Sequence, residues 1–306
     1  MDISGAFPTF VVTLREGVEA ALVVGIVLAY LNKANQRHLN PWVYGGIATG
    51  IGASVLVGIL FTGLLVQLET AEQVYARILK PLLEAVFSAI AIGLLSWMLI
   101  WMTRQARSLK SDVEETIAAA LQGDQRAGWG VFGLILVAVL REGFETVIFI
   151  AAQFQSGWIP VAGAIAGLVG ATIIGILLFQ LGVKINLRLF FQGMGVLLLL
   201  IVAGLVVGML RHLDAAAIVF TDFYPQYAGL CFSPGSSCLL GPQVWDASQI
   251  LPDREFPGIL LKAFFGYTQH LYLAQAIAYV AFLLTVGSTY LQSILPITSP
   301  AKPRET

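Results

Sequence analysis

The chain has 306 residues, of which 58% are hydrophobic and 11% are charged, whereas an ordinary soluble domain has about 45–50% apolar and about 25% charged residues. This composition predicts a membrane protein and excludes a soluble enzyme, a nucleic-acid-binding protein and a disordered linker protein. The 17 basic and 18 acidic residues leave a formal charge of -1. Neither a basic surface for nucleic acid nor an acidic tail is therefore expected.

Seven apolar stretches are each long enough to cross the hydrocarbon core of a bilayer, which takes about 20 residues. They cover roughly residues 6–31, 42–66, 82–103, 129–153, 158–181, 189–211 and 271–295. The first is not expected to be a cleaved signal peptide, because Asp2 stands where a basic n-region is usual and charges interrupt the apolar stretch. The sequence predicts one all-α polytopic domain over residues 1–306, with seven transmembrane helices.

Basic residues are distributed unevenly between the segments that connect these spans. If the N-terminus lies outside, ten Lys and Arg residues fall in inner segments and five in outer ones. The positive-inside rule then predicts an outer N-terminus and a cytoplasmic C-terminus in a multi-pass protein of the cell membrane. Trp97 and Trp101, in the inner half of the third span, are expected to be interfacial anchors.

The segment 212–270 joins the sixth and seventh spans and is rich in Pro, Gly, Ser, Tyr and Asp. With this topology it lies outside, where Cys231 and Cys238 can form a disulfide or remain free thiols. A solvated surface position is the simpler interpretation of each polar residue here when it is taken alone. The residues that could receive a metal are Asp214, Asp222, Asp246, Tyr224, Tyr227, His212 and His270.

A motif of the form Arg-Glu-Gly-X-Glu occurs twice. Residues 14–19 read LREGVE and residues 140–145 read LREGFE, an offset of 126. A second offset, of 117, relates two sets of glycines: Gly46, Gly50 and Gly58, and Gly163, Gly167 and Gly175. We therefore expect two duplicated halves, repeat A over about 6–103 and repeat B over about 129–211. A three-span repeat reverses its own orientation, so the prediction is two inverted three-helix repeats plus a seventh helix.

On an α-helix, the arginine and both glutamates of each motif lie on one side. These residues are Arg15, Glu16 and Glu19 in the first motif, and Arg141, Glu142 and Glu145 in the second. Charged groups at the bilayer centre are costly and usually line an ion or substrate pathway. The alternative is a pair of buried Arg-Glu bridges that hold the halves together, but one arginine leaves the second glutamate of its motif unpaired.

Four carboxylates and two guanidiniums give the two motifs a formal charge of -2. Carboxylates suit hard cations, so the motifs predict a site for a multivalent metal ion. Glu84 could add a further carboxylate, or could be a helix-start residue at the outer interface. Gly17 and Gly143 could permit close helix approach, or a local break that frees carbonyl oxygens as ligands.

The two motifs resemble those of the high-affinity ferric iron permeases, the oxidase-dependent iron transporter family that includes the bacterial EfeU-type permeases. The resemblance extends to residues 244–248, which read VWDAS, and to Gly266, Tyr267, Gln275 and Tyr279. It implies that the four motif glutamates bind and translocate iron, that the two arginines are their companions, and that the region at Asp246 receives iron. Gln249 stands where fungal permeases have an acidic residue, which weakens direct iron capture there.

The resemblance further implies that Fe(II) is oxidised at the outer face by a partner ferroxidase and handed over as Fe(III). A periplasmic iron-delivery protein is another expected partner, beside the lipid of the membrane. Iron is then a transported substrate and no cofactor is permanently bound. The sequence leaves the oligomeric state open.

Two other functions compete with iron transport. A permease of the same architecture could carry lead, manganese or another divalent ion. A membrane-embedded lipid pyrophosphate phosphatase also uses intramembrane Glu and Arg, but residues 234–237 carry only the start of its Pro-Gly-X-Ser-Arg signature and Cys238 stands in place of the arginine. We therefore expect a permease and not an enzyme.

Overall fold

The computed structural model describes residues 5–69, 73–105, 115–117, 127–152, 158–181, 186–231, 237–253 and 255–294. The long helices are α1 (Ala6–Lys33), α2 (Asn40–Glu69), α3 (Gln73–Gln105), α5 (Ala127–Ala152), α6 (Trp158–Phe179) and α7 (Leu187–Phe223). A last helical segment consists of α9 (Leu273–Phe282), the π-helix η4 (Leu283–Gly287) and α10 (Ser288–Ile294). Most of the segment 104–128, which joins the third and fourth predicted spans, lies outside the described residues.

Five of the described helices are long and apolar enough to cross a membrane, by length and composition. They correspond to α2, α3, α6, α7 and the segment from α9 to α10. The helices α1 and α5 hold the two motifs, and each motif places three charged residues in its helix. An all-α, multi-pass membrane protein is thus confirmed, and the count of seven spans stays a prediction.

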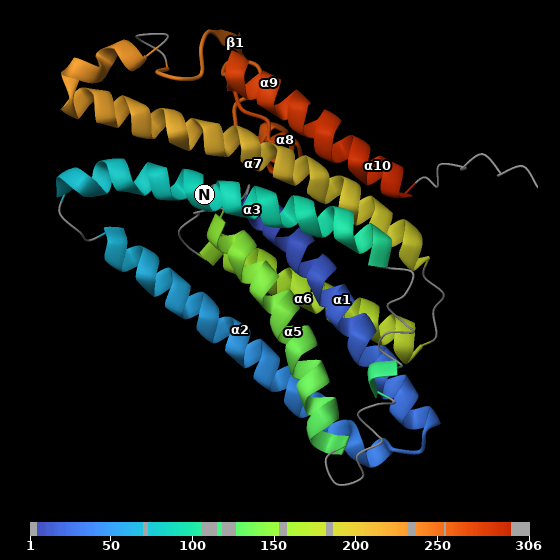
Figure 1. Cartoon of the computed structure of the whole chain (residues 1–306). Helices are drawn as coiled ribbons and strands as arrows, with labels where there is room; N and C mark the ends of the chain where they lie inside the picture. The colour runs from blue at the N-terminus through green and yellow to red at the C-terminus, as the bar shows by residue number, and fades with distance from the viewer. Residues whose placement is uncertain are drawn as a thin grey trace, which may run out of the picture.

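The helices of the two halves pair crosswise. α1 packs mainly against α6, α2 against α5, and α3 against α7, while α1 also contacts α5. In Figure 1, α3, α7 and the segment from α9 to α10 run side by side across one part of the molecule, and α1, α2, α5 and α6 lie on the other. This arrangement brings the two motif-bearing helices against each other.

Glycines at matching positions bring the crosswise pairs close. A Cβ atom at Gly163 or Gly167 of α6 would collide with the backbone of α1, at Ala6 and at the following turns. Gly46 and Gly50 of α2 face α5 in the same way, where a Cβ atom would meet side chains and a carbonyl oxygen. Small residues let membrane helices approach closely, so these glycines allow the close packing of α6 on α1 and of α2 on α5.

The main hydrophobic core lies between α1, α3, α5, α7 and α10. It includes Val12, Met98, Phe149, Leu198 and Tyr290, all buried. The core residues Val12 of α1 and Phe149 of α5 lie close in sequence to the motifs, so this core packs α1 and α5 together with α3 beside the motifs.

The chain between α7 and α9 is more structured than its composition suggests. It forms the 3-10 helix η3 (Pro225–Leu230), the strand β1 (Gln243–Asp246), the helix α8 (Gly258–Phe265) and the strand β2 (His270–Tyr272). β1 and β2 pair antiparallel, with Gln243 opposite Tyr272 and Asp246 opposite His270. A disulfide joins Cys231 to Cys238.

The helix α7 extends to Phe223, beyond the predicted end of the sixth span at 211. The added turns contain the sequence Asp-Ala-Ala-Ala at residues 214–217, and alanine has the highest helix propensity of all residues. Hydropathy marked only the apolar part of this helix, so the segment that connects it to α9 begins later than the sequence predicted.

Candidate metal site

The two motifs meet near the middle of α1 and α5. One carboxylate oxygen from each of Glu16, Glu19 and Glu142 lies within 4.8 Å of the other two. The Oε2 atoms of Glu16, Glu142 and Glu145 are buried and have no hydrogen-bond partner in the part of the chain that the structure describes. Carboxylates from both halves therefore face a common point and have oxygens left for a cation.

Arg15 is buried among these carboxylates, with a side chain that is 4% exposed. Its Nη1 atom donates to Glu16 Oε1 and to the sulfur of Met98, at 3.3 Å from the sulfur. Its Nη2 atom lies 3.1 Å from Glu19 Oε1. Arg15 thus offsets part of the negative charge from within the cluster.

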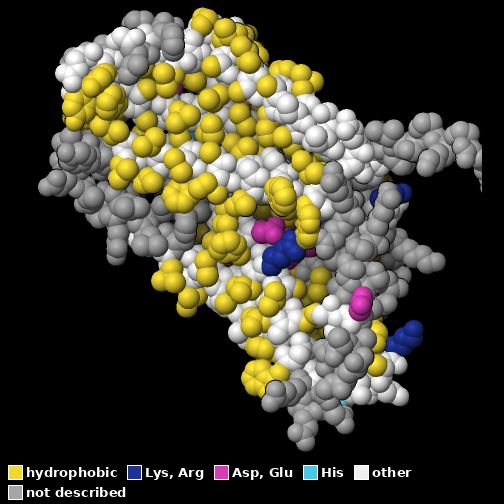
Figure 2. Space-filling view, in the orientation of Figure 1, with side chains coloured by type: hydrophobic (Ala, Val, Ile, Leu, Met, Phe, Trp, Pro, Cys, Tyr) yellow, Lys and Arg dark blue, Asp and Glu magenta, His cyan; other side chains and the backbone are white. Residues whose placement is uncertain are grey.

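Arg141, the matching residue of the second motif, has a different environment. Its Nε atom donates to Glu145 Oε1 at 3.2 Å, and its guanidinium carbon lies 4.6 Å from the centre of the Trp101 ring. Its side chain is 48% exposed. Figure 2 shows a basic side chain beside acidic ones in the middle of a face covered with hydrophobic side chains. The two motifs match in sequence but not in burial.

The motif glycines lie where the helices approach most closely. A Cβ atom at Gly17 would be 2.6 Å from the Cβ atom of Ala171 in α6, and one at Gly143 would collide with Ser54 in α2. Ser54 and Ala171 are themselves related by the offset of 117 found among the glycines. Both α1 and α5 are continuous helices through these positions, so the structure has close approach and not the local helix break considered from sequence.

Glu84 is not brought into the carboxylate cluster. Its Oε2 atom lies 2.7 Å from Nδ1 of His212, which pairs α3 with α7. Along α3, Glu84 precedes Met98 by 14 residues, about 21 Å at the helical rise of about 1.5 Å per residue. Glu84 therefore belongs to a separate contact nearer the start of α3.

A cavity of about 150 Å³ lies beside this contact, between the start of α1 and the helices α3, α7 and α8. Its wall includes Ser88, Arg211, His212, Lys262 and Tyr267. By the measure in which one water needs only about 10–15 Å³, this space holds several waters. The cavity lies next to the segment that joins α7 to α9, which supplies Lys262 and Tyr267 to its wall.

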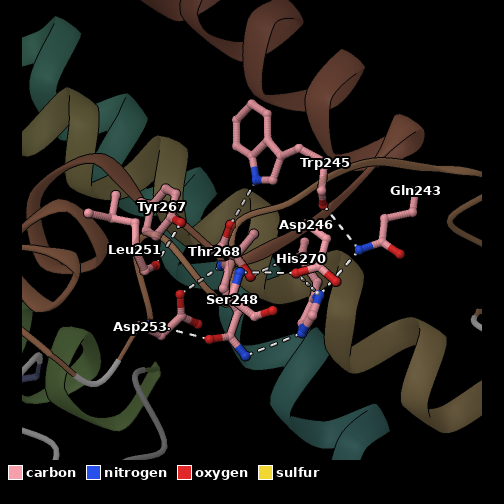
Figure 3. Close-up of polar contacts among 10 residues, drawn as sticks. Gln243, Trp245, Asp246, Ser248, Leu251, Asp253, Tyr267, Thr268 and His270 are labelled. Carbon is pink, nitrogen blue, oxygen red and sulfur yellow. Dashed lines mark hydrogen bonds and ion pairs between the residues drawn. The ribbon is translucent and has the colours of Figure 1, made fainter.

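The predicted outer residue Asp246 lies at the end of β1 and is exposed. The backbone amide of Ser248 donates to its Oδ1 atom at 3.0 Å, and Nδ1 of His270 lies 3.5 Å from the same atom. The hydrogen bond from Ser248 holds the pKa of Asp246 below its usual value, so this carboxylate is ionised at neutral pH. Figure 3 shows that Asp246 and His270 face each other, with Gln243 beside the imidazole.

Neighbouring contacts fix the loop that carries this pair (Figure 3). Burial raises the pKa of the Tyr267 hydroxyl, which stays protonated and donates to the Leu251 carbonyl at 2.9 Å. The Trp245 indole stacks on Tyr267 and donates to the Thr268 carbonyl at 3.0 Å. Asp253 accepts from the backbone amide of Gln269 at 2.7 Å. These contacts stabilise the segment between α7 and α9 around Asp246.

The two other outer aspartates occupy different positions. Asp214 is buried, and its Oδ1 atom accepts hydrogen bonds from the backbone amides of Cys238 at 2.9 Å and Leu239 at 2.6 Å. It anchors the disulfide-bearing loop to α7. Asp222 is exposed near the end of α7. The candidate tyrosines Tyr224 and Tyr227 both pack against Phe220.

Sequence reasoning missed two residues that contact the motifs. Met98 and Trp101 of α3 touch Arg15 and Arg141, respectively. Trp101 was expected to be an interfacial anchor, and that role stays a prediction beside its contact with a motif arginine. The sequence offered one signal for this. Met98 and Trp101 are three residues apart, which places them on the same face of a helix, and that span has no charged residue after Glu84.

Comparison with known proteins identifies the family. A model of the iron permease FTR1 family matches residues 6–291, which is nearly the whole described chain. The chain belongs to the iron permease FTR1 family. The family suggested by the duplicated motif is thereby confirmed.

Several relatives match along most of their length. An uncharacterized protein of Synechocystis sp. is 50% identical over 296 residues, which is 96% of each chain. The ferrous iron permease EfeU of Escherichia coli O6:K15:H31 is 29% identical over 265 residues, 86% of this chain and 87% of the relative. The ferrous iron permease EfeU of Yersinia pestis is 29% identical over 280 residues, 91% of this chain and 90% of the relative. No solved structure matches this chain.

Proposed function

We propose that this chain imports iron across the cell membrane through a site built from Glu16, Glu19, Glu142 and Glu145. The observation that carries the proposal is the convergence of carboxylates from α1 and α5, with buried oxygens that no described protein donor satisfies. Unpaired carboxylates are expensive inside a membrane. Arg15 pairs with both Glu16 and Glu19, and Arg141 pairs with Glu145, but these ion pairs alone do not satisfy the buried Oε2 atoms.

We infer that the two halves are inverted repeats and that the chain crosses the membrane seven times. The crosswise helix pairs support this symmetry. So do the matching contacts of Gly17 with Ala171 and of Gly143 with Ser54. A pseudo-two-fold axis in the membrane plane places both motifs at the same depth, which is the geometry a shared central site requires.

The proposed orientation has the N-terminus outside and the C-terminus in the cytoplasm. The basic residues of the connecting segments favour it. The disulfide between Cys231 and Cys238 agrees with it, because disulfides persist on the oxidising side of a membrane. With this orientation a trivalent ion moving inward gains about 7 kcal/mol from a potential of about 100 mV.

The outer segment is proposed to receive the ion before it reaches the carboxylate cluster. Asp246 is exposed and ionised, and Asp222 is a second exposed carboxylate on the same side. Glu84 and the cavity beside it lie between this segment and the cluster along α3. Asp214 serves the fold, since backbone amides occupy its Oδ1 atom.

We propose Fe(III) as the ion that enters the cluster, because hard carboxylate oxygens suit a hard trivalent cation. A partner ferroxidase or a periplasmic delivery protein would supply it. Fe(II) is the second candidate, favoured by the names of the Escherichia coli and Yersinia pestis relatives as ferrous iron permeases. The same names are consistent with transport and not with the phosphatase alternative.

Metal uptake by the purified protein in liposomes tests the proposal. Chelated Fe(III), Fe(II) kept reduced, Mn(II) and Pb(II) would be supplied outside the liposomes at equal concentrations. The membrane potential would be set so that the liposome interior is negative. We expect iron to accumulate well above Mn(II) and Pb(II), and Fe(III) above Fe(II). Higher uptake of Fe(II) would assign the ferrous ion. Equal uptake of Mn(II) or Pb(II) would support the divalent permease, and no uptake of iron would refute the proposal.

A further inference from the structure

One face of α3 contacts both motif arginines. Met98 and Trp101 are three residues apart, so they lie on the same side of the helix. The Met98 sulfur accepts from Arg15 at 3.3 Å, and the Trp101 ring lies 4.6 Å from the guanidinium carbon of Arg141. A helix outside the repeated motif therefore contacts the only two cations that the motifs contribute.

The two arginines differ in the contacts that hold their guanidinium groups in place. Arg15 is enclosed by two carboxylates and the Met98 sulfur. Arg141 makes one ion pair among the described residues, through Nε to Glu145, and its other close contact is the indole face of Trp101. A guanidinium over an indole ring is attracted by the negative face of the ring. Trp101 thus competes with the carboxylates for Arg141.

The place of Arg141 decides how much charge an incoming cation meets. A guanidinium lying across the cluster would fill the space between the carboxylates and repel a metal ion. In the structure it lies beside the cluster, and the Oε2 atoms of Glu142 and Glu145 are left without a described partner. In this position the guanidinium carbon of Arg141 lies 4.6 Å from the centre of the Trp101 ring.

We propose that Trp101 is a positioning residue for metal binding, which holds Arg141 beside the carboxylate cluster so that Glu142 and Glu145 stay open to the cation. This inference rests on the proposed function. Met98 has the corresponding contact with Arg15, but Arg15 is already fixed by Glu16 and Glu19. Trp101 is therefore the sensitive position of the two.

Equilibrium dialysis of radiolabelled iron against the purified full-length protein tests this role. Trp101→Leu should raise the Kd for iron between about twofold and thirtyfold, the range of a cation–π contact. Trp101→Phe, which keeps an aromatic face of weaker attraction, should fall between the parent and the leucine variant. The matched control is Trp97→Leu, one turn earlier on α3 with a side chain that is 73% exposed, and its Kd should not change.

A double substitution separates positioning from packing. In an Arg141→Gln background, Trp101→Leu should add no further change in Kd, because the residue through which it acts is gone. An equal rise in both backgrounds would show a purely structural role and would overturn the inference. If the leucine variants do not fold, Trp101→Phe with and without Arg141→Gln gives the same comparison.

The proposed function has its own control in the same assay. Glu16→Gln with Glu142→Gln should abolish iron binding. Loss of binding there, with an unchanged Kd in Trp101→Leu, would overturn only the role of Trp101. Unchanged binding in the glutamine double variant would instead refute the carboxylate site itself.

Discussion

The two motifs contain the same charged residues, but Arg15 is buried and Arg141 is half exposed. The four glutamates and two arginines could be predicted from the sequence, because the motif recurs with the same spacing and charged residues are rare in this chain. The pairing of Glu84 with His212, and the contacts of Met98 and Trp101, could not be predicted. These contacts depend on how α3 packs against α1, α5 and α7, which local spacing does not encode.

The difference in burial between Arg15 and Arg141 predicts that the protein tolerates substitution at the two positions to different extents. Arg15→Lys keeps the charge but loses the planar fork that holds Glu16 and Glu19 together, because a single ammonium group cannot pair with both carboxylates in the same geometry. We expect it to lower both iron uptake and the thermal midpoint of the detergent-solubilised protein. Arg141→Lys should lower uptake less and leave the midpoint nearly unchanged, because that side chain is half exposed. Equal losses in the two variants would contradict the asymmetry.

Hydropathy predicts the positions of the long helices, and small residues allow the close contacts between them. The described helices agree with the apolar stretches to within a few residues, apart from the earlier start of α3 and the longer α7. The strand pair and α8 of the outer segment were not predicted. Their residues have neither a long apolar run nor clean alternation, and they are held by a disulfide, an aspartate anchor and a tyrosine hydroxyl.

Enlarging the motif glycines tests the close approach of the helices. Gly17→Val would force its side chain against Ala171, and Gly143→Val would do the same against Ser54. Overpacking of this kind costs about 1–3 kcal/mol, so both variants should have a lower thermal midpoint and a lower yield of folded protein. Gly93→Val is the control, because nothing lies within 4 Å of its Cβ position. A destabilised control with unaffected motif variants would refute this packing.

The assembled molecule is best explained as two halves that share one site. Crosswise pairing sets α1 and α5 against each other, and the segment between α7 and α9 packs on α7 through α8 and η3. Fold class and family were predicted from composition and the duplicated motif. The proposed orientation in the membrane rests on the distribution of basic residues and on the disulfide.

Accessibility of single cysteines tests that orientation. Ile250→Cys in the outer segment, 87% exposed in the parent, should react with a membrane-impermeant maleimide on intact cells. Ala34→Cys, exposed at the other end of α1, should react only after the membrane is permeabilised. The native cysteines are joined in a disulfide and should give little background. Labelling of both positions from the same side would contradict the proposed topology.

The most direct test of the carboxylate site is radiolabelled iron uptake by the double variant Glu19→Gln with Glu145→Gln in liposomes. These changes remove one negative charge from each half while nearly preserving side-chain size. Glu255→Gln, at an exposed outer position, is the matched control and should transport at the parent rate. We expect uptake by the double variant to fall at least about tenfold, a loss of about 1.4 kcal/mol or more, at equal reconstituted amounts. Uptake at the parent rate would show that the motifs are structural bridges and that iron takes another path.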